Sequence, residues 1–410
     1  MKNIKNIIDV VDGHLCNGCG VCSYLAPDSL EMIDAVNIGL RPQLKENIVI
    51  DSLPHNLLDV CSGWNLVRKA KEAESIDSLY NDWGVVYEVW EAYASDKEIR
   101  RLGSSGGVIT ALSLFCLEQK KMEGILNTSS NSENPFLNQS KLITNKQRLL
   151  ETTGSRYSPS SPCEQLHYIE NASSPCVFVG KPCDVAALQK ARKLKTKLDK
   201  NLGLVISFFC AGVPSTAGTT QLLKNESIND LSKLKSLRYR GNGWPGFWSA
   251  KFSEGKKTKE KKLTYQESWG FLQKFRQWRC YICPDHSGEF SDIAIGDPWY
   301  REIKENDLGR SMIVIRSNLG REIVQEAAEK GYITLEKSDP NILPLSQPNL
   351  IKSNGSIWGK LLILNIFNVS TPQYIGFSLF KKWIFNLTAR EKVQSTLGTV
   401  KRIYVKKLKE

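Results

Sequence analysis

The sequence predicts a mixed α/β (α+β) protein, with a small cysteine-bearing N-terminal unit, an α/β core and a helical, basic C-terminal extension. Two short apolar runs, 176–180 and 203–209, flank a helical segment at 184–195, which is the strand–helix–strand order of a parallel sheet. Changes in composition place the boundaries near residues 82 and 340. We therefore expect three units, 1–82, 83–340 and 341–410.

Further elements follow from local pattern. Residues 83–94, rich in Val, Tyr and Trp, predict a strand that leads through a Gly- and Ser-rich turn into a helix at 108–119. The polar stretch 127–141 predicts an exposed loop, and the lysine-rich run 253–262 a hairpin tip or surface loop. A helix at 321–330 and a strand at 332–336 complete the core.

Composition bounds the class of protein. A chain of 410 residues with 41% hydrophobic and 24% charged residues has the composition of a globular protein. No apolar run approaches the roughly 20 residues of a bilayer-spanning helix, and the N-terminus lacks a cleavage site. Eleven cysteines at tight spacings suit metal ligation better than disulfides. We therefore expect a cytoplasmic or equivalent reducing compartment.

The formal charge of +12 is concentrated at the end of the chain, where ten Lys or Arg stand against two acids from Lys360 onward. Such a segment attracts an acidic protein, a phosphate-bearing cofactor or an anionic membrane, or is a solvated tail. Residues 374–387 mix Phe, Trp and Lys, so we expect at most peripheral membrane contact. The chain has no aromatic-plus-basic module of RNA readers, so no nucleic-acid partner is expected.

The first cysteine group has the spacing C-x2-C-x2-C, formed by Cys16, Cys19 and Cys22. This spacing is typical of a 4Fe–4S cluster, with glycines that let the loop turn and direct its amides at sulfur. Ala26 stands where bacterial ferredoxins carry the fourth cysteine, so we expect Cys61 to supply it. The alternative is a structural zinc site with four cysteine ligands.

A second group centres on Cys280 and Cys283, a pair that is weak evidence alone. Cys183 and Cys210 each closely follow a predicted buried strand, where cofactors collect in α/β sheets, so the four could hold a second 4Fe–4S cluster. The alternative is that buried cysteines simply act as small apolar residues. We assign that role to Cys116 and Cys176 and leave Cys163 unassigned.

Seven motifs in order resemble the coenzyme F420 hydrogenase/dehydrogenase beta-subunit family, over roughly residues 10 to 340. They are the Cys16–Cys22 opening, Ser105-Gly-Gly-Val-Ile-Thr-Ala-Leu112, Gly180-Lys-Pro-Cys-Asp184, Phe208-Phe-Cys210, Tyr239-Arg-Gly-Asn-Gly-Trp-Pro-Gly246, Cys280-x2-Cys283-Pro-Asp285 and Asp292-Ile-Ala-Ile-Gly-Asp297. The resemblance implies an FAD-binding α/β domain and assigns the two cysteine sets to clusters.

The resemblance also implies flavin binding at the turn Ser104–Thr110 and near 153–157. The residues concerned are Ser104, Ser105, Gly106, Gly107, Thr110, Ser155, Arg156 and Tyr157. Amides at the start of the helix after Gly107 can hold a pyrophosphate, and Arg156 and Lys181 can neutralise its charge. The alternative is that Ser104 or Ser105 merely caps the helix.

Two residues are candidates for acid–base or substrate roles. His286, three residues after Cys283, is a candidate proton donor. Asp297 follows a predicted strand and could touch substrate, or could simply form a turn.

The expected function is an iron–sulfur flavoprotein oxidoreductase. Single electrons would pass from an acidic carrier such as ferredoxin through two 4Fe–4S clusters to FAD, and then to a small organic substrate or coenzyme F420. One rival is an electron-transfer beta subunit without its own substrate, in a larger hydrogenase or dehydrogenase. The other is a zinc-binding interaction protein. The substrate, the direction of reaction and a possible homo-oligomer stay open.

Overall fold

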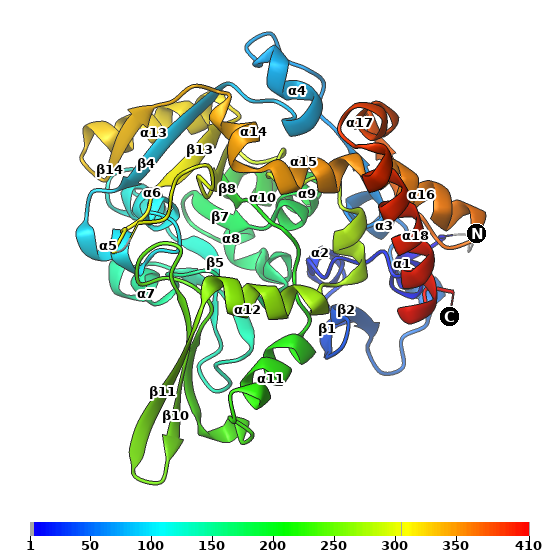
Figure 1. Ribbon diagram of the computed structural model, residues 1–410, viewed down its shortest axis with the longest axis horizontal. Coiled ribbons are helices and arrows are strands. Elements are labelled where there is room, and N and C mark those ends of the chain that lie inside the picture. Colours follow the sequence, from blue (N-terminus) through cyan, green and yellow to red (C-terminus); the bar gives the residue numbers. More distant parts are fainter. Residues whose placement is uncertain (1–3, 305, 410) are drawn as a thin grey trace.

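The computed structural model describes residues 4–304 and 306–409 and confirms the α/β fold class. An eight-stranded sheet forms its centre, in the order β14-β4-β13-β12-β8-β7-β5-β6 (Figure 1). The strands are β4 (Glu88–Ala94), β5 (Ile125–Ser130), β6 (Asn138–Ile143), β7 (Cys176–Gly180), β8 (Leu202–Phe208), β12 (Ile293–Gly296), β13 (Ser311–Ile315) and β14 (Ile333–Lys337).

Four neighbouring strands of this sheet, β5, β7, β8 and β12, run parallel. In their register Phe178 pairs with Val205, and Ile206 pairs with Ile293. The other strands join antiparallel: β13, β4 and β14 on one side and β6 on the other. The carboxyl ends of the four parallel strands therefore meet at one edge, where ligands collect in α/β sheets.

Helices cover both faces of the sheet. Val177, Val179 and Ile206 pack with α6 (Val108–Glu118) and α13 (Asn318–Glu329) in one apolar cluster. Phe178 and Val205 point the other way and pack with α9 (Pro182–Ala191) and α10 (Thr196–Asn201). Because successive side chains of a strand alternate between faces, these buried runs supply two cores at once.

The N-terminal unit packs against the C-terminal helices. It contains α1 (Ile7–Asp12), α2 (Val21–Leu25), the hairpin β1 (Leu30–Ala35) and β2 (Gly39–Leu44), α3 (Leu57–Val60), β3 (Asn65–Val67) and α4 (Asp77–Trp83). The C-terminal helices are α14 (Ile342–Ser346), α15 (Pro348–Gly355), α16 (Ile357–Ile366), α17 (Leu379–Phe385) and α18 (Ala389–Val405). Strand β15 (Gln373–Ile375) pairs with β3, and Leu364 and Ile403 share an apolar cluster with Cys16 and Cys22.

A three-stranded sheet projects from the body of the molecule at the lower left of Figure 1. It consists of β9 (Leu234–Arg238), β10 (Phe247–Glu254) and β11 (Lys257–Thr264), and α11 (Thr216–Asn225) and α12 (Tyr265–Leu272) lie at its base. Residues 253–262 form the end of β10, the turn and most of β11, so they make up the tip of this hairpin, as expected.

Most predicted elements are confirmed with small shifts, for example α6 at 108–118 and α13 at 318–329. The predicted strand at 83–94 begins only at Glu88, because α4 continues to Trp83. The exposed loop predicted at 127–141 is wrong, since β5 and β6 pair there as an antiparallel hairpin. The segment 374–387 holds the end of β15 and the short helix α17. In the described ranges, every helix is too short or too polar to cross a bilayer.

Candidate functional site

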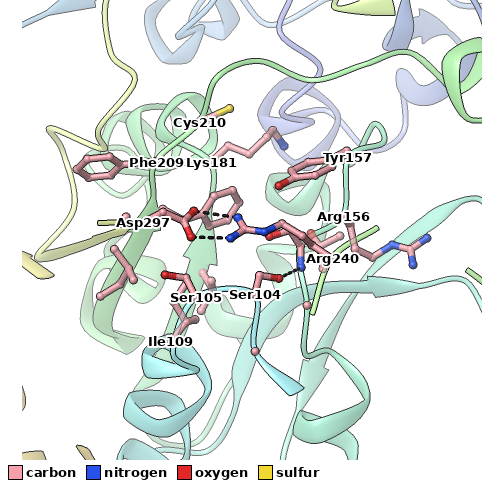
Figure 2. Close-up of a pocket in the computed structure, with 18 of the residues that line it drawn as sticks. Ser104, Ser105, Ile109, Arg156, Tyr157, Lys181, Phe209, Cys210, Arg240 and Asp297 are labelled. Carbon is pink, nitrogen blue, oxygen red and sulfur yellow. Dashed lines mark hydrogen bonds and ion pairs between the residues drawn. The ribbon is translucent and has the colours of Figure 1, made fainter. Parts of the chain in front are cut away.

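A cavity of about 260 Å³ lies at the carboxyl edge of the parallel strands (Figure 2). Gly180 of β7, Phe208 of β8 and Gly296 of β12 form part of its wall, so three parallel strands end at it. Asn127 and Thr128 of β5 line it as well. The cavity occupies the position that the strand order favours for a ligand.

The turn before α6 forms one side of the cavity. Gly106 and Gly107 have φ values of +66° and +74°, which side chains rarely adopt. A Cβ at Gly107 would stand 2.6 Å from the carbonyl oxygen of Ile99, so a larger residue has no room. Gly107 itself is the N-cap of α6, and no side chain caps the helix. The first amides of α6 are therefore available to a phosphate group.

Both serines of the turn form hydrogen bonds with groups outside α6, so the alternative that one of them caps this helix is wrong. The Ser104 Oγ accepts a hydrogen bond of 2.6 Å from the backbone N–H of Ser155. The Ser105 Oγ donates to the carbonyl oxygen of Arg310 at 2.8 Å. Thr110 lies in the first turn of α6 and lines the cavity. These bonds fix the turn against the loop at 153–157 and leave the helix end open.

Arg156 holds the cavity wall rather than projecting its charge inward. Its guanidinium donates to the carbonyl oxygens of Leu237 (2.9 Å) and Pro135 (2.8 Å) and to the side chain of Asn138. Figure 2 shows the group turned away from the pair formed by Arg240 and Asp297. All three of its nitrogens are thus engaged by the protein.

Lys181 is a buried cation at the N-terminus of α9, on the cavity wall. Its Nζ lies 2.7 Å from the carboxylate of Asp184 and donates to the Oγ of Ser160 at 3.0 Å. Burial lowers the pKa of Lys181, but the charge of Asp184 more than offsets this and the pKa is raised. The side chain therefore stays protonated, and its charge is fixed beside the cavity.

Arg240 is the site residue that the sequence interpretation did not single out. Its guanidinium binds both carboxylate oxygens of Asp297, at 2.9 and 2.6 Å, and is buried (Figure 2). The indole N–H of Trp244 donates to the same carboxylate at 2.9 Å. Asp297 therefore lines the cavity as expected, but as the partner of an arginine rather than as a free base.

Aromatic rings surround this ion pair. The rings of Tyr265 and Trp299 stack at 5.3 Å, and the Arg240 guanidinium lies 4.8 Å from the centre of Tyr265. Tyr157 contacts Trp269 of α12 at 4.9 Å, and burial raises the pKa of Tyr157. The lining of the cavity thus combines aromatic rings with cationic and amide groups, as a flat ring system with a phosphate tail requires.

The thiols of Cys16, Cys19, Cys22 and Cys61 are buried and converge in the N-terminal unit. Burial raises the pKa of Cys22, and the charges of Cys16, Cys19 and Cys61 raise it further, so the four thiols lie within electrostatic range of one another. The backbone N–H of Gly18 donates to the Sγ of Cys16 at 3.4 Å. Buried sulfurs that repel one another as thiolates fit a cationic iron–sulfur core, which takes four cysteines.

Cys183, Cys210, Cys280 and Cys283 form the second convergent set. Burial raises the pKa of Cys283 to about 12, and the charge of Cys280 contributes to this rise. Burial also raises the pKa of Cys183, and the charges of Cys210 and Cys283 raise it further. Cys183, Cys280 and Cys283 line a small cavity of about 30 Å³. Within residues 4–304 and 306–409, no three His, Cys, Asp or Glu side chains are grouped to hold a single metal ion. In a 4Fe–4S cluster, by contrast, each cysteine binds a different iron atom, so the four sulfurs do not have to meet at one ion.

A short polar bridge joins the two sets. The Oγ of Ser62, next to Cys61, donates to the carbonyl oxygen of Cys183 at 2.9 Å, and accepts from Asn17 at 2.9 Å. Cys210 of the second set also lines the large cavity, as does Lys181 two residues before Cys183 (Figure 2). The second cysteine set therefore lies next to the cavity, and the first set is joined to the second through Ser62.

His286 lies outside the cavity lining, behind the second cysteine set. Its Nδ1 is 2.9 Å from the carbonyl oxygen of Cys210, and its Nε2 is 3.2 Å from the Oγ of Ser353. Burial lowers the pKa of His286 to about 4. The imidazole is therefore neutral at ordinary pH and is held by protein groups on both nitrogens.

The remaining cysteines are also buried. Cys116 and Cys176 lie within apolar clusters, as expected. Cys163 contacts the first set: its backbone N–H donates to the carbonyl oxygen of Cys19 at 3.0 Å, and a hydrogen bond with its thiol lowers the pKa of Cys19.

The fold and site define an α/β protein with two four-cysteine sets beside a cavity at the carboxyl edge of its sheet. Two family models match this chain: the N-terminal domain of the coenzyme F420 hydrogenase/dehydrogenase beta subunit over residues 89–167, and the C-terminal domain over residues 174–341. The chain belongs to the coenzyme F420 hydrogenase/dehydrogenase beta-subunit family.

Curated relatives agree with this family. The beta subunit of coenzyme F420 hydrogenase from Methanococcus voltae is 26% identical over 252 residues, covering 60% of this chain and 83% of that protein. The beta subunit of F420-dependent formate dehydrogenase from Methanocaldococcus jannaschii is 26% identical, with 60% of each chain covered. The coenzyme F420-dependent sulfite reductase of the same organism is 24% identical over 80% of this chain but only 48% of its own length.

A solved structure supports the fold. A chain of the F420-reducing [NiFe] hydrogenase complex from Methanosarcina barkeri superposes with a TM-score of 0.52 at 18% identity, covering 72% of this chain and 97% of that chain.

Proposed function

We propose that this protein is an iron–sulfur flavoprotein oxidoreductase that passes single electrons from a low-potential carrier, such as a ferredoxin, to FAD and on to an organic acceptor or coenzyme F420. The observation that carries the proposal is that two four-cysteine sets, joined through Ser62, lie next to a cavity that Cys210 of the second set lines. The names of the three relatives described above, each linked to coenzyme F420, support the choice of acceptor.

The chain's own residues would hold each group in place. The first cluster would take Cys16, Cys19, Cys22 and Cys61, and the second Cys183, Cys210, Cys280 and Cys283. The open amides of α6 would bind the flavin pyrophosphate, and the fixed charge of Lys181 lines the same cavity. When bound, the clusters would carry single electrons and the flavin would pair them.

The polar side chains at the cavity would then orient the acceptor, and the aromatic side chains would shield it from water. The pair of Arg240 and Asp297 is nearly neutral overall, so it can place a hydrogen-bonding edge against a flat acceptor without a net charge. Tyr265 and Trp269 would stack with the acceptor ring. His286 would serve as a neutral brace for the loop of Cys210 rather than as a proton donor, because both of its nitrogens are held by protein groups.

Anaerobic purification tests the proposal directly. We expect a brown protein with about eight iron atoms and one FAD per chain, since each of the two four-cysteine sets binds one 4Fe–4S cluster. Cys61→Ala should lose about half of the iron, and Cys183→Ala the other half, while Cys116→Ala should keep both clusters. A colourless protein, or one that holds zinc and no acid-labile sulfide, would refute the proposal.

A second candidate is an electron-transfer subunit without its own substrate. The relatives named above as beta subunits favour it, and so does the superposed chain of a hydrogenase complex. Affinity purification from the native host distinguishes the two. Reduction of coenzyme F420 by the isolated chain supports the first function, whereas turnover only with a co-purifying catalytic partner supports the second.

A further inference from the structure

We propose that an acidic one-electron carrier protein docks on a cationic collar around Tyr281, so that electrons enter through the second cysteine set. The collar consists of Arg276, Arg402 and Lys406. This inference rests on the proposed electron-transfer function and adds to it the entry point and the partner's surface.

The collar is defined by its contacts with one ring. The guanidinium carbons of Arg276 and Arg402 lie 4.4 and 4.8 Å from the centre of the Tyr281 ring, and the Nζ of Lys406 lies 5.9 Å from it. Lys406 also donates to the carbonyl oxygen of Arg276 at 3.4 Å. Three cations from two distant parts of the chain are thus held around one half-buried side chain.

These cations lack acidic partners among the residues that the structure describes. Several other arginines are paired: Arg310 with Glu336, Arg301 with Glu91, and Arg321 with Glu74 and Glu88. In the described ranges, no carboxylate forms an ion pair with Arg276, Arg402 or Lys406. The buried Lys360 donates to the carbonyl oxygen of Tyr281 at 2.8 Å, and burial together with the charges of Arg402 and Arg276 lowers the pKa of Lys360 to about 7. Like charges at this spacing repel, so the collar gains most from an added anionic surface.

The collar is adjacent to the second cysteine set through Arg276 and Tyr281. Tyr281 stands between Cys280 and Cys283 in the sequence. Arg276 donates to the carbonyl oxygen of Ala211, the residue after Cys210, at 2.9 Å. A Cβ at Gly212 would lie 2.7 Å from the Cδ of Arg276 and 3.1 Å from the Cβ of Cys280, so arginine, loop and cysteine are in close contact.

Exposure distinguishes the two sets as entry points. The four cysteines of the first set are buried, at 5 to 8% of their full exposure, whereas those of the second set are all half-buried, three of them in the small cavity and Cys210 in the large one. Electron transfer between proteins requires the two redox groups to approach closely, and electrostatic complementarity orients the encounter. A carrier with a carboxylate-rich face around its own cluster fits the collar, and places that cluster next to Cys280 and Cys283.

The test measures binding of a small acidic two-cluster ferredoxin to the full chain holding its cofactors. The variant Arg402→Gln/Lys406→Gln removes two collar charges. The control Lys257→Gln/Lys261→Gln removes two charges from exposed positions on β11, in the projecting sheet. At low ionic strength we expect the collar variant to weaken binding about tenfold and the control less than twofold, with the difference disappearing near 0.5 M salt.

Equal loss in both variants, or no loss in either, would overturn the docking site. So would a collar variant that loses only inorganic phosphate binding, or only sedimentation with phosphatidylglycerol vesicles, while its affinity for ferredoxin is unchanged. Iron, sulfide and flavin are quantified in the same samples. A wild-type protein that holds them but binds ferredoxin independently of the collar refutes this inference alone, whereas a protein that lacks them refutes the proposed function.

Discussion

At the scale of single residues, the cavity depends on one buried ion pair. Arg240 and Asp297 are 57 positions apart in the sequence, and their side chains are 3% and 17% exposed. Nothing local in either segment indicates the pairing, which is why sequence reasoning identified Asp297 without Arg240. The pairing depends on the tertiary fold, which brings the loop after β9 to the residue that follows β12.

Removing one partner of this pair should be costly. Asp297→Asn leaves the Arg240 guanidinium buried without its counter-charge, so we expect the free energy of unfolding to fall by about 3 kcal/mol. The control Glu336→Gln breaks the more exposed pair with Arg310, for which about 0–1 kcal/mol is expected. Urea denaturation of both variants measures the difference. Equal effects would show that the Arg240–Asp297 pair contributes no more than a surface pair.

A second residue-scale prediction concerns Lys382, which is 3% exposed and whose Nζ has no hydrogen-bond partner in the described residues. Burial lowers its pKa to about 8 and Arg68 adds to the shift, although Glu289, Asp82 and Asp285 oppose it. In the unfolded chain the pKa of this lysine is close to its ordinary value of 10.5. Between about pH 8 and 10.5 the unfolded chain binds more protons, so stability rises with pH across this window.

Replacing this lysine should therefore stabilise the protein at neutral pH. Lys382→Met should gain about 2–3 kcal/mol at pH 7, and about half of this gain should disappear at pH 9.5. Lys381→Met, at the exposed neighbouring position, should change stability little at either pH. Thermal unfolding midpoints at both pH values provide the measurement, and a gain independent of pH would contradict the role of the buried charge.

At the scale of elements, the start of α6 shows how backbone conformation produces a binding site. Gly107→Ala should abolish most flavin binding, because its Cβ would lie 2.6 Å from the carbonyl oxygen of Ile99 and displace the open helix end. Gly331→Ala is the matched control: its φ is also positive, at +76°, but no atom lies within 4 Å of the added carbon. Flavin content per chain, measured after denaturation, should fall only in the first variant.

The elements also show what sequence patterns can predict. Strands β7 and β8 were predictable because both of their faces are buried, which leaves continuous apolar runs. The hairpin of β5 and β6 was missed because its residues are polar. Asn127 and Thr128 line the cavity, so polar side chains that suggested a loop belong to the site. Pairing at the edge of a sheet depends on the whole fold, which a local pattern does not contain.

At the scale of the whole molecule, the two ends of the chain protect the first cysteine set together. The cysteine spacing at 16–22 was readable from the sequence because its ligands are local, and Cys61 could be added from the same unit. The covering by α16 and α18, which lie side by side at the right of Figure 1, was not predictable, since it joins segments more than 300 residues apart. Ile403 of α18 is 1% exposed and packs in the apolar cluster that holds Cys16 and Cys22.

This covering should control how fast iron is lost in air. Ile403→Ala opens a cavity in the apolar cluster that holds Cys16 and Cys22, so we expect a loss of about 2–4 kcal/mol in stability and a faster loss of about half of the bound iron. Val405→Ala, on the same helix but 70% exposed, should behave like the wild type. Iron content and visible absorbance followed after exposure to air measure the rates. If both variants lost iron at the wild-type rate, α18 would not be what shields the first cysteine set from oxygen.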